Sequence, residues 1–354
     1  TLNFGDHDDC IGELLGKERE GIHVMFNMMN EARLEVGMQG LGHATAAYEH
    51  AVAYAKERIQ SVPVWELHNP EASPITIIGH PDVRRNLLWM KAHVEGMRAM
   101  NYYAAYCMDL AAVVEDGQKR KDWQGLVELL IPVCKAYCSD TGLLVCSKAI
   151  DVYGGYGYCS EYPVEQYLRD CKISSIYEGT NGVQALDLVG RKLGERGGAN
   201  VVHLFGRMAE TVQGAMKILA LQKGVAVLGE SLQALKEVTE GFAAMAKSAG
   251  FLIPILYASP YLRILGDVLL GHFLFEGAAI ACQRLQEIYQ AEGVEDSLGR
   301  QRALVHENTD AAFYQGKIVA AKFFAKEVLM TVKGRCKAIQ SAERAPLEMA
   351  DESF

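Results

Sequence analysis

Residues Gly21 to Gln60 read GIHVMFNMMNEARLEVGMQGLGHATAAYEHAVAYAKERIQ, and this stretch decides the fold class. Its apolar side chains recur on one face of a 3.6-residue period, at Ile22, Met25, Phe26, Met29, Ala32 and Val36. That spacing predicts a long amphipathic helix that runs to about Gln60.

The same period returns along most of the chain. Four prolines interrupt residues 61–81 and predict a long loop there. Thr180 is a suitable N-cap for a helix that begins at Asn181 and runs to about Leu193. The other predicted helices span 82–115, 122–152, 164–172, 201–221, 226–249, 261–292 and 299–340. We therefore expect an all-α fold with a four-helix bundle and a second helical domain.

Composition excludes several classes of protein. The 354 residues are 50% hydrophobic and include only 9 prolines, which favours a large helical core over a β-sandwich. The net charge of −9 argues against nucleic acid as a partner. The nine cysteines show no zinc-binding spacing and indicate reduced thiols. The longest charge-free apolar stretch is too short to cross a bilayer, so no membrane span is expected.

Glu178 is the first candidate for a catalytic residue. It lies in a turn, Tyr177-Glu178-Gly179, between apolar segments that would shield a carboxylate from water. A shielded carboxylate suits a general base. The alternative is an ordinary solvated turn glutamate.

Two further groups of residues have both a structural and a functional interpretation. Gly154 and Gly155 can form a tight turn, or they can let the backbone approach a ligand closely. Asn30 and Arg33 share a helix face. They are either a surface pair or the polar wall of a pocket for an anion.

Three separated strings together resemble one family, the acyl-CoA dehydrogenases. They are GIHVMFNMMNEAR (21–33), AIDVYGGYGY (149–158) followed by EYPVE, and RDCKISSIYEGTNGVQ (169–184). Their order and spacing also agree with the family, over residues 1–194. The remainder resembles the extra helical domain of the longer bacterial members, and the subgroup with the greatest resemblance is the 3-methylmercaptopropionyl-CoA dehydrogenase-like enzymes.

This resemblance implies a domain organisation. Residues 1–20, which read as a strand or an extended arm, would be the remnant of a β-domain. Residues 21–194 would form the C-terminal helical bundle of the family, and residues 199–354 the additional helical domain. The chain would then be a fragment of the full enzyme, and inactive by itself.

The resemblance also implies a reaction, the FAD-dependent oxidation of an acyl-CoA thioester to the trans-2-enoyl-CoA. Glu178 matches the base that removes the α-proton. Some members carry the base on the first long helix, where this chain has Ala32. The implied substrate-binding residues are Asn30, Arg33, Tyr177 and Gly179.

The cofactor implied is FAD. Thr180 and Asn181 match positions that face the flavin, and Arg58, Gln60, Gly154 and Gly155 match contacts that the family takes from a neighbouring subunit. The family's glutamine before the glycine pair is Asp151 here, and a carboxylate disfavours a pyrophosphate.

The implied partners are an acyl-CoA substrate, an electron-transferring flavoprotein and further copies of the chain in a dimer or tetramer. The implied location is the cytoplasm. A non-catalytic helical assembly or binding module with the same fold is the alternative function, and an intact Glu178 favours the enzyme.

Overall fold

The structure of the protein is a computed structural model that describes residues 1–245 and 250–354. The side chains of His23, Phe26 and Asn27 are not described either. The predicted packing of Phe26 and the end of the predicted helix 226–249 therefore lie outside the described residues.

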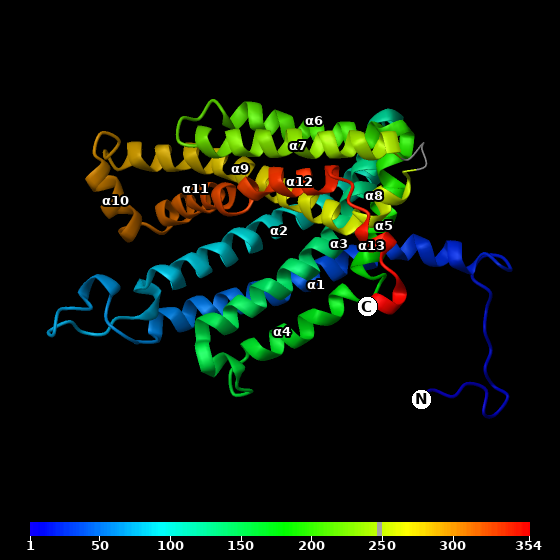
Figure 1. Cartoon of the computed structure of the whole chain (residues 1–354), viewed down its shortest axis with the longest axis horizontal. Helices are drawn as coiled ribbons and strands as arrows, with labels where there is room; N and C mark the ends of the chain where they lie inside the picture. The colour runs from blue at the N-terminus through cyan, green and yellow to red at the C-terminus, as the bar shows by residue number, and fades with distance from the viewer. Residues whose placement is uncertain (246–249) are drawn as a thin grey trace.

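The described residues form an all-α fold without a strand, as the sequence predicts. A single isolated β-bridge joins Ile59 to Thr76. The helices, shown in Figure 1, are α1 (Gly21–Glu57), α2 (Pro81–Val113), α3 (Gly117–Tyr153), α4 (Val164–Lys172), α5 (Asn181–Gly190), α6 (Ala199–Ala215), α7 (Gln222–Met245), α8 (Leu252–Leu256), α9 (Ala258–Ala291), α10 (Leu298–Glu307), α11 (Thr309–Glu327), α12 (Val332–Gln340) and α13 (Ala345–Glu348).

Glycines let α1 and α3 approach each other closely. A Cβ on Gly40 would lie 2.8 Å from the carbonyl oxygen of Cys138, and one on Gly142 would lie 2.6 Å from the carbonyl oxygen of Gly40. Neither position therefore accepts a larger side chain. This contact fixes the part of α3 that carries the side chains beneath the Glu178 turn.

The predicted helix 299–340 is wrong as a single element, because two interruptions divide it into α10, α11 and α12. Asn308 adopts an extended conformation between α10 and α11, and its Oδ1 accepts a hydrogen bond from the amide of Ala311 at 3.0 Å. A short 3₁₀ turn, Leu329–Thr331, separates α11 from α12. An Asn that caps one helix necessarily ends the helix before it.

The two helical regions share one continuous core. Helix α9 packs against α2, α3 and α5 of the N-terminal region as well as against its own neighbours. Gly266 and Gly96 permit this approach, since a Cβ on them would lie 2.1 Å from Tyr137 and 2.6 Å from Leu270, respectively. The regions on either side of the glycine-rich segment 194–198 therefore pack as one body.

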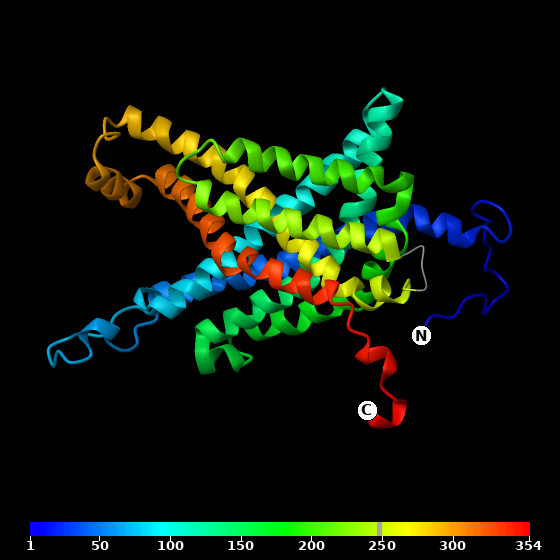
Figure 2. The ribbon, with the colours of Figure 1, turned by 45° about the horizontal axis from the view of Figure 1, so that its top comes forward.

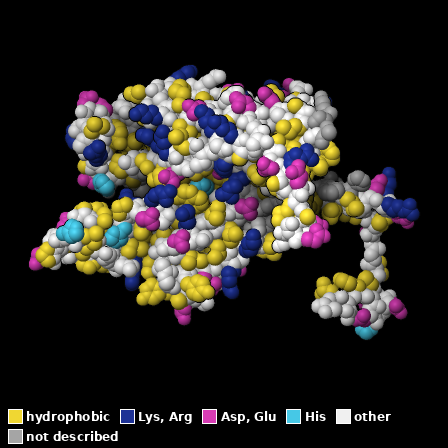
Figure 3. Space-filling view, in the orientation of Figure 1, with side chains coloured by type: hydrophobic (Ala, Val, Ile, Leu, Met, Phe, Trp, Pro, Cys, Tyr) yellow, Lys and Arg dark blue, Asp and Glu magenta, His cyan; other side chains and the backbone are white. Residues whose placement is uncertain are grey.

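Two segments extend from this body. Residues 1–20 contain no strand and are extended and almost entirely exposed, so the arm was predicted correctly and the strand alternative was not found. Figure 3 shows this arm standing away from the rest of the molecule. The loop 58–80 projects from the opposite end, as Figure 2 shows, and exposes Val64, Trp65 and Leu67.

Two helical stretches are long and apolar enough to cross a membrane, Gly117–Tyr158 and Ala258–Ala291, although the sequence analysis predicted none. Within their most apolar windows, 83% and 78% of the residues are buried inside the structure. Core helices of soluble proteins pass the same test of length and composition, so this is weak grounds for a membrane span.

The described cysteines are all free, in agreement with the predicted reduced thiols. Six of them are buried: Cys107, Cys134, Cys138, Cys146, Cys171 and Cys336. They behave as small apolar side chains of the core.

Candidate active site

The turn between α4 and α5 holds two successive residues in the left-handed region. Glu178 has φ 56° and Gly179 has φ 83°. Gly179 adopts this conformation at no steric cost, whereas Glu178 is strained by about 1–2 kcal/mol. Such strain persists only where the surroundings enforce it, which is common at functional sites.

Two side chains of α5 and its N-cap enforce the turn. The buried Gln184 donates from Nε2 to the carbonyl oxygens of Glu178 and Gly179, at 3.3 and 3.4 Å. Thr180 accepts a hydrogen bond from the amide of Val183 through its Oγ1 at 3.3 Å, which confirms the predicted N-cap. The backbone of Glu178 is thus held from the side of α5.

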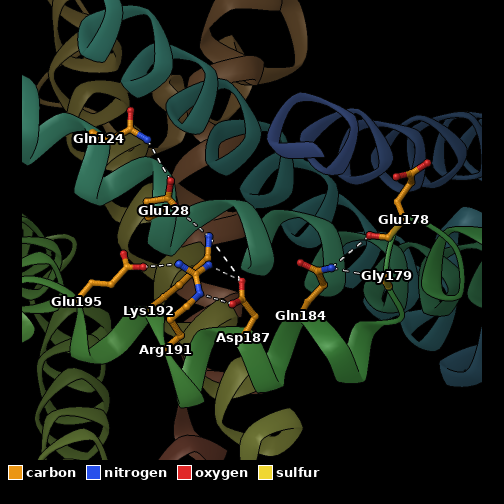
Figure 4. Close-up of polar contacts among 9 residues, drawn as sticks. All are labelled: Gln124, Glu128, Glu178, Gly179, Gln184, Asp187, Arg191, Lys192 and Glu195. Atoms are coloured by element: carbon orange, nitrogen blue, oxygen red, sulfur yellow. Dashed lines mark hydrogen bonds and ion pairs between the residues drawn. The ribbon is translucent and has the colours of Figure 1, made fainter. Parts of the chain in front are cut away.

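The side chain of Glu178 points away from Gln184, as Figure 4 shows. It is half-buried, and its carboxylate makes no hydrogen bond or ion pair with any residue that the structure describes. The neighbouring Tyr177 donates a hydrogen bond to Oε1 of Gln39 on α1 and so ties the turn to that helix. The backbone of Glu178 is therefore held in place, while its carboxylate oxygens have no partner among the described residues.

The apolar residues around Glu178 shield it less than the sequence suggests. Each is more than a third exposed in this chain, namely Ile173, Ile176, Val183 and Leu186. They form an open apolar rim rather than a closed pocket. A rim of this kind is suited to contact another part of a protein or an apolar ligand.

A buried polar cluster lies beneath the turn, and the sequence analysis missed it. Lys135 of α3 is fully buried and donates from Nζ to Oδ1 of Asn181 at 2.9 Å. Asn181 donates in turn to Oγ of Ser139 at 2.9 Å and to Oδ1 of Asp140 at 2.8 Å. The Asn181 side chain thereby anchors the start of α5 on α3. A lysine inside the otherwise uncharged run Leu129–Cys138 was the available signal.

Lys135 also connects Glu178 to Arg33 electrostatically. Burial lowers the pKa of the Lys135 amine to about 8, against the attraction of Asp140, and the charges of Arg33 and Glu178 both act on it. Lys135 therefore bonds to Asn181 and lies within electrostatic reach of both Arg33 and Glu178.

Arg33 is a cation without a partner. It is half-buried on α1, its Nε is shielded from solvent, and no described residue bonds to its side chain. Asn30, one turn earlier, is half-buried as well. An unpaired and partly desolvated guanidinium favours an anionic ligand, because only an anion would restore its lost hydrogen bonds.

The remaining predicted cofactor residues lie elsewhere, at the far end of α1 and α3. Arg58 and Arg33 are twenty-five positions apart along α1, which corresponds to about 37 Å. Arg58, Gln60 and Gly154 line a separate cavity of about 430 Å³. The predicted substrate residue Arg33 and the predicted cofactor residue Arg58 therefore lie far apart in one copy of the chain.

This distal cavity fits a phosphate group in most respects. The Arg58 guanidinium lies 5.3 Å from the centre of the Tyr156 ring and makes no ion pair with a described residue. Nothing lies within 4 Å of a Cβ on Gly154 or Gly155, so their backbone is open to close approach. Asp151 also lines the cavity and opposes an anion there.

Comparison with known proteins identifies the chain. A family model described as "Acyl-CoA dehydrogenase, C-terminal domain" matches residues 19–193, and one described as "Acetyl-CoA dehydrogenase C-terminal like" matches residues 204–350. The chain belongs to the acyl-CoA dehydrogenase family. The two matched regions contain the Glu178 turn and the additional helices, respectively.

A curated relative, 3-methylmercaptopropionyl-CoA dehydrogenase of Ruegeria pomeroyi, is 36% identical over 92% of this chain and 51% of its own length. The chain spans about half the length of the curated relatives it matches.

Two solved structures share the fold at 18% identity. ACDH-11 of Caenorhabditis elegans, in complex with C11-CoA, has a TM-score of 0.71 over 96% of this chain and 50% of its own chain. An acyl-CoA dehydrogenase of Bacillus anthracis, complexed with FAD, has a TM-score of 0.65 over 94% of this chain and 52% of its own.

Proposed function

We propose that the chain is the C-terminal part of an FAD-dependent acyl-CoA dehydrogenase that converts an acyl-CoA thioester to the trans-2-enoyl-CoA. The observation that carries this proposal is Glu178, which lies on a strained turn within electrostatic reach of the buried Lys135 and whose carboxylate has no partner among the described residues. The 36% identical relative acts on an acyl-CoA thioester by its name, and the solved relatives hold FAD or an acyl-CoA.

Glu178 takes the α-proton of the thioester in this proposal. An α-proton beside a thioester is weakly acidic, so the base has to lie close to it and out of water. The hydrogen bonds from Tyr177 to Gln39 and from Gln184 to the turn hold the backbone that carries the Glu178 side chain. FAD supplies the acceptor for the hydride that leaves the β-carbon.

Arg33 and Asn30 bind the CoA part of the substrate in this proposal. The unpaired guanidinium gives a phosphate a forked set of donors, and Asn30 adds a neutral donor one turn away. Tyr177 and Gly179 border the thioester through the backbone of the turn.

The cofactor site is shared between two copies in this proposal. Thr180 and Asn181 of one copy approach the flavin, and Arg58, Gln60, Gly154 and Gly155 of the other hold its phosphates. In support of this division, Arg58, Gln60 and Gly154 line a cavity whose lining includes neither Thr180 nor Asn181. The enzyme is then an obligate dimer or a higher oligomer.

We also propose the remaining features of the parent enzyme. Residues 21–194 and 199–354 act as the family's helical bundle and its additional helical domain, with residues 1–20 as the end of a β-domain. An electron-transferring flavoprotein reoxidises the flavin, and the enzyme works in the cytoplasm. The chain by itself is inactive, because the apolar rim around Glu178 is open to water.

The substitution Glu178→Gln in the full-length enzyme tests the catalytic role. Glutamine keeps the size of the side chain but cannot accept the proton, so turnover should fall about 10²- to 10⁴-fold. Flavin absorbance should stay at the level of the unmodified enzyme. The measurement is acyl-CoA oxidation with a dye as electron acceptor.

The matched control is Glu161→Gln, at an exposed glutamate in the turn before α4. It should leave turnover unchanged. Full activity of the Glu178→Gln enzyme would remove Glu178 from the mechanism and favour a non-catalytic binding module instead.

A further inference from the structure

A cavity of about 480 Å³ lies between the N-terminal helices α3 and α5 and the C-terminal helices α9 and α12. Most of its wall is apolar, from residues such as Ala136, Leu262, Ile264, Ala338 and Ile339. Its lining includes Asn181 and Asp140 of the polar cluster beneath the Glu178 turn, but not Glu178, Arg33 or Arg58, so it adjoins the candidate site from the side of α9 and α12. Its size suits a small organic molecule.

Two arginines supply the cationic part of this wall. Arg263 is exposed and has no hydrogen bond or ion pair with any described residue. Arg335 donates from Nη2 to Oδ2 of Asp267 at 2.6 Å, and its Nε has no partner. Asp267 also accepts a hydrogen bond from the hydroxyl of Tyr137 at 2.5 Å. Arg335 is thus largely neutralised, while Arg263 is not.

The balance of charge leaves room for one anion. Asp140 lines the cavity, but it accepts a hydrogen bond from Asn181 and its charge is opposed by the buried Lys135 behind the wall. Asp267 is likewise opposed by Arg335. The charge of Arg263 therefore remains without a counterion among the described residues.

We propose that this cavity binds an amphipathic monocarboxylate, such as a free medium-chain fatty acid. The hydrocarbon part would replace water against the apolar wall, and the carboxylate would pair with Arg263. Such a ligand contacts both the N-terminal and the C-terminal helices at once. Its binding therefore stabilises the packing of α9 and α12 against α3 and α5.

The chain of residues 1–354 itself is sufficient for the test, with octanoate as the probe and isothermal titration as the measurement. We expect one saturable octanoate site per chain and a rise in melting temperature with octanoate concentration. Octanol, which has the same chain length and no charge, should bind at least about tenfold more weakly because it cannot pair with Arg263.

Two substitutions locate the site. Ala338→Trp fills the cavity from an exposed position of α12 and should abolish binding. Arg263→Gln removes the free cation and should weaken octanoate binding about tenfold while leaving octanol unchanged. Ala303→Trp and Arg302→Gln, at exposed positions of α10 outside the cavity, are the matched controls and should have no effect.

Three results would overturn the proposal: no octanoate binding, equal binding of octanoate and octanol, or unchanged binding in a folded Ala338→Trp protein. Circular dichroism establishes that each variant is folded. If Ala338→Trp fails to fold, the comparison of Arg263→Gln with Arg302→Gln decides by itself, and equal affinities would refute the assignment.

Discussion

Glu178 and Gly179 share a left-handed backbone conformation, but they differ in the space available for a side chain. Glu178 has a positive φ, which is unusual for a residue other than glycine. Gly179 also has a positive φ and, in addition, has no room for a side chain. A Cβ on Gly179 would lie 2.7 Å from Nε2 of Gln184, the atom that holds both carbonyls of the turn. A substitution of Gly179 would therefore strain the backbone and also displace the Gln184 side chain that holds the turn.

Gly179→Ala should therefore destabilise the chain by about 1–3 kcal/mol, from left-handed strain and the clash with Gln184. Urea unfolding measures this free energy. The control is Gly182→Ala, three residues on, where a Cβ would lie 3.8 Å from Oγ1 of Thr180 and the backbone is helical. Alanine should stabilise that position by up to about 1 kcal/mol. Equal effects of the two substitutions would contradict the geometry of the turn.

Lys135 should make stability depend on pH in the alkaline range. Its pKa is about 8 in the folded chain and about 10.4 when unfolded, so the unfolded state binds more protons between these values. Stability from this residue therefore rises with pH from about 8 to about 10.4, by about 1–3 kcal/mol. The measurement is the unfolding free energy of the wild type minus that of Lys135→Met across this range. A difference that stays flat would show that Lys135 has an ordinary pKa.

The residues of the candidate site were predictable to different degrees. Glu178 was visible in the sequence because a carboxylate between glycine and tyrosine in a turn is a local pattern. Lys135 was not, because its partner Asn181 lies forty-six positions away and only the packing of α5 on α3 joins them. The left-handed φ of Glu178 could not be predicted from the sequence either, because it accompanies side-chain hydrogen bonds from Gln184 that hydrophobic periodicity does not encode.

Helix α1 is the element that separates the predicted substrate residue Arg33 from the predicted cofactor residue Arg58. Its length puts Arg33 and Glu178 near one end of the bundle and Arg58 near the other. Variants that each lose one group can therefore be combined. A mixed dimer of Glu178→Gln and Arg58→Ala chains has one doubly altered site and one intact site if each site draws on both copies.

Co-expression of the two full-length variants should then restore about a quarter of the wild-type turnover, because half of the dimers are mixed and each has one intact site. Each variant alone should be nearly inactive. The measurement is acyl-CoA oxidation per protein chain in purified mixtures. If both residues served the same copy's site, every site would carry a defect and mixing would restore nothing.

The positions of most helices could be predicted from hydrophobic periodicity, and their ends could not. The periodicity places α1, α2 and α3 within a few residues of their observed bounds. It continues without a break through residues 299–340, although only α11 and α12 of the three helices there bury an apolar face. Asn308 interrupts the helix through its own side chain, a cap that the apolar period does not encode.

At the scale of the whole molecule, the sequence also did not predict that the two helical regions share one core. The glycines at 194–198 look like a domain linker, and nothing in the periodicity of α9 says that two of its faces are covered by different regions. Gly266 decides this packing, because a Cβ there would meet the ring of Tyr137 at 2.1 Å. The contact joins residues that are more than a hundred positions apart.

Gly266→Ala should consequently destabilise the entire chain, by about 1–3 kcal/mol or more, since Tyr137 is buried and its hydroxyl is held by Asp267. Calorimetry should show a single transition at a lower temperature for both regions. Gly277→Ala on the same helix, where nothing lies within 4 Å, should raise the melting temperature slightly. Two separate transitions, only one of them shifted, would contradict a shared core.

The projecting loop 58–80 gives the molecule a built-in optical reporter. The chain has three tryptophans, and Trp65 near the loop tip is 65% exposed, whereas Trp89 and Trp123 are half-buried in the body. Its neighbours Val64 and Leu67 line the Arg58 cavity. If a second copy covers this cavity as proposed, the Trp65 indole should pass from water to an apolar contact and its fluorescence should shift to shorter wavelength. Association of the copies can thus be followed in real time without any attached dye.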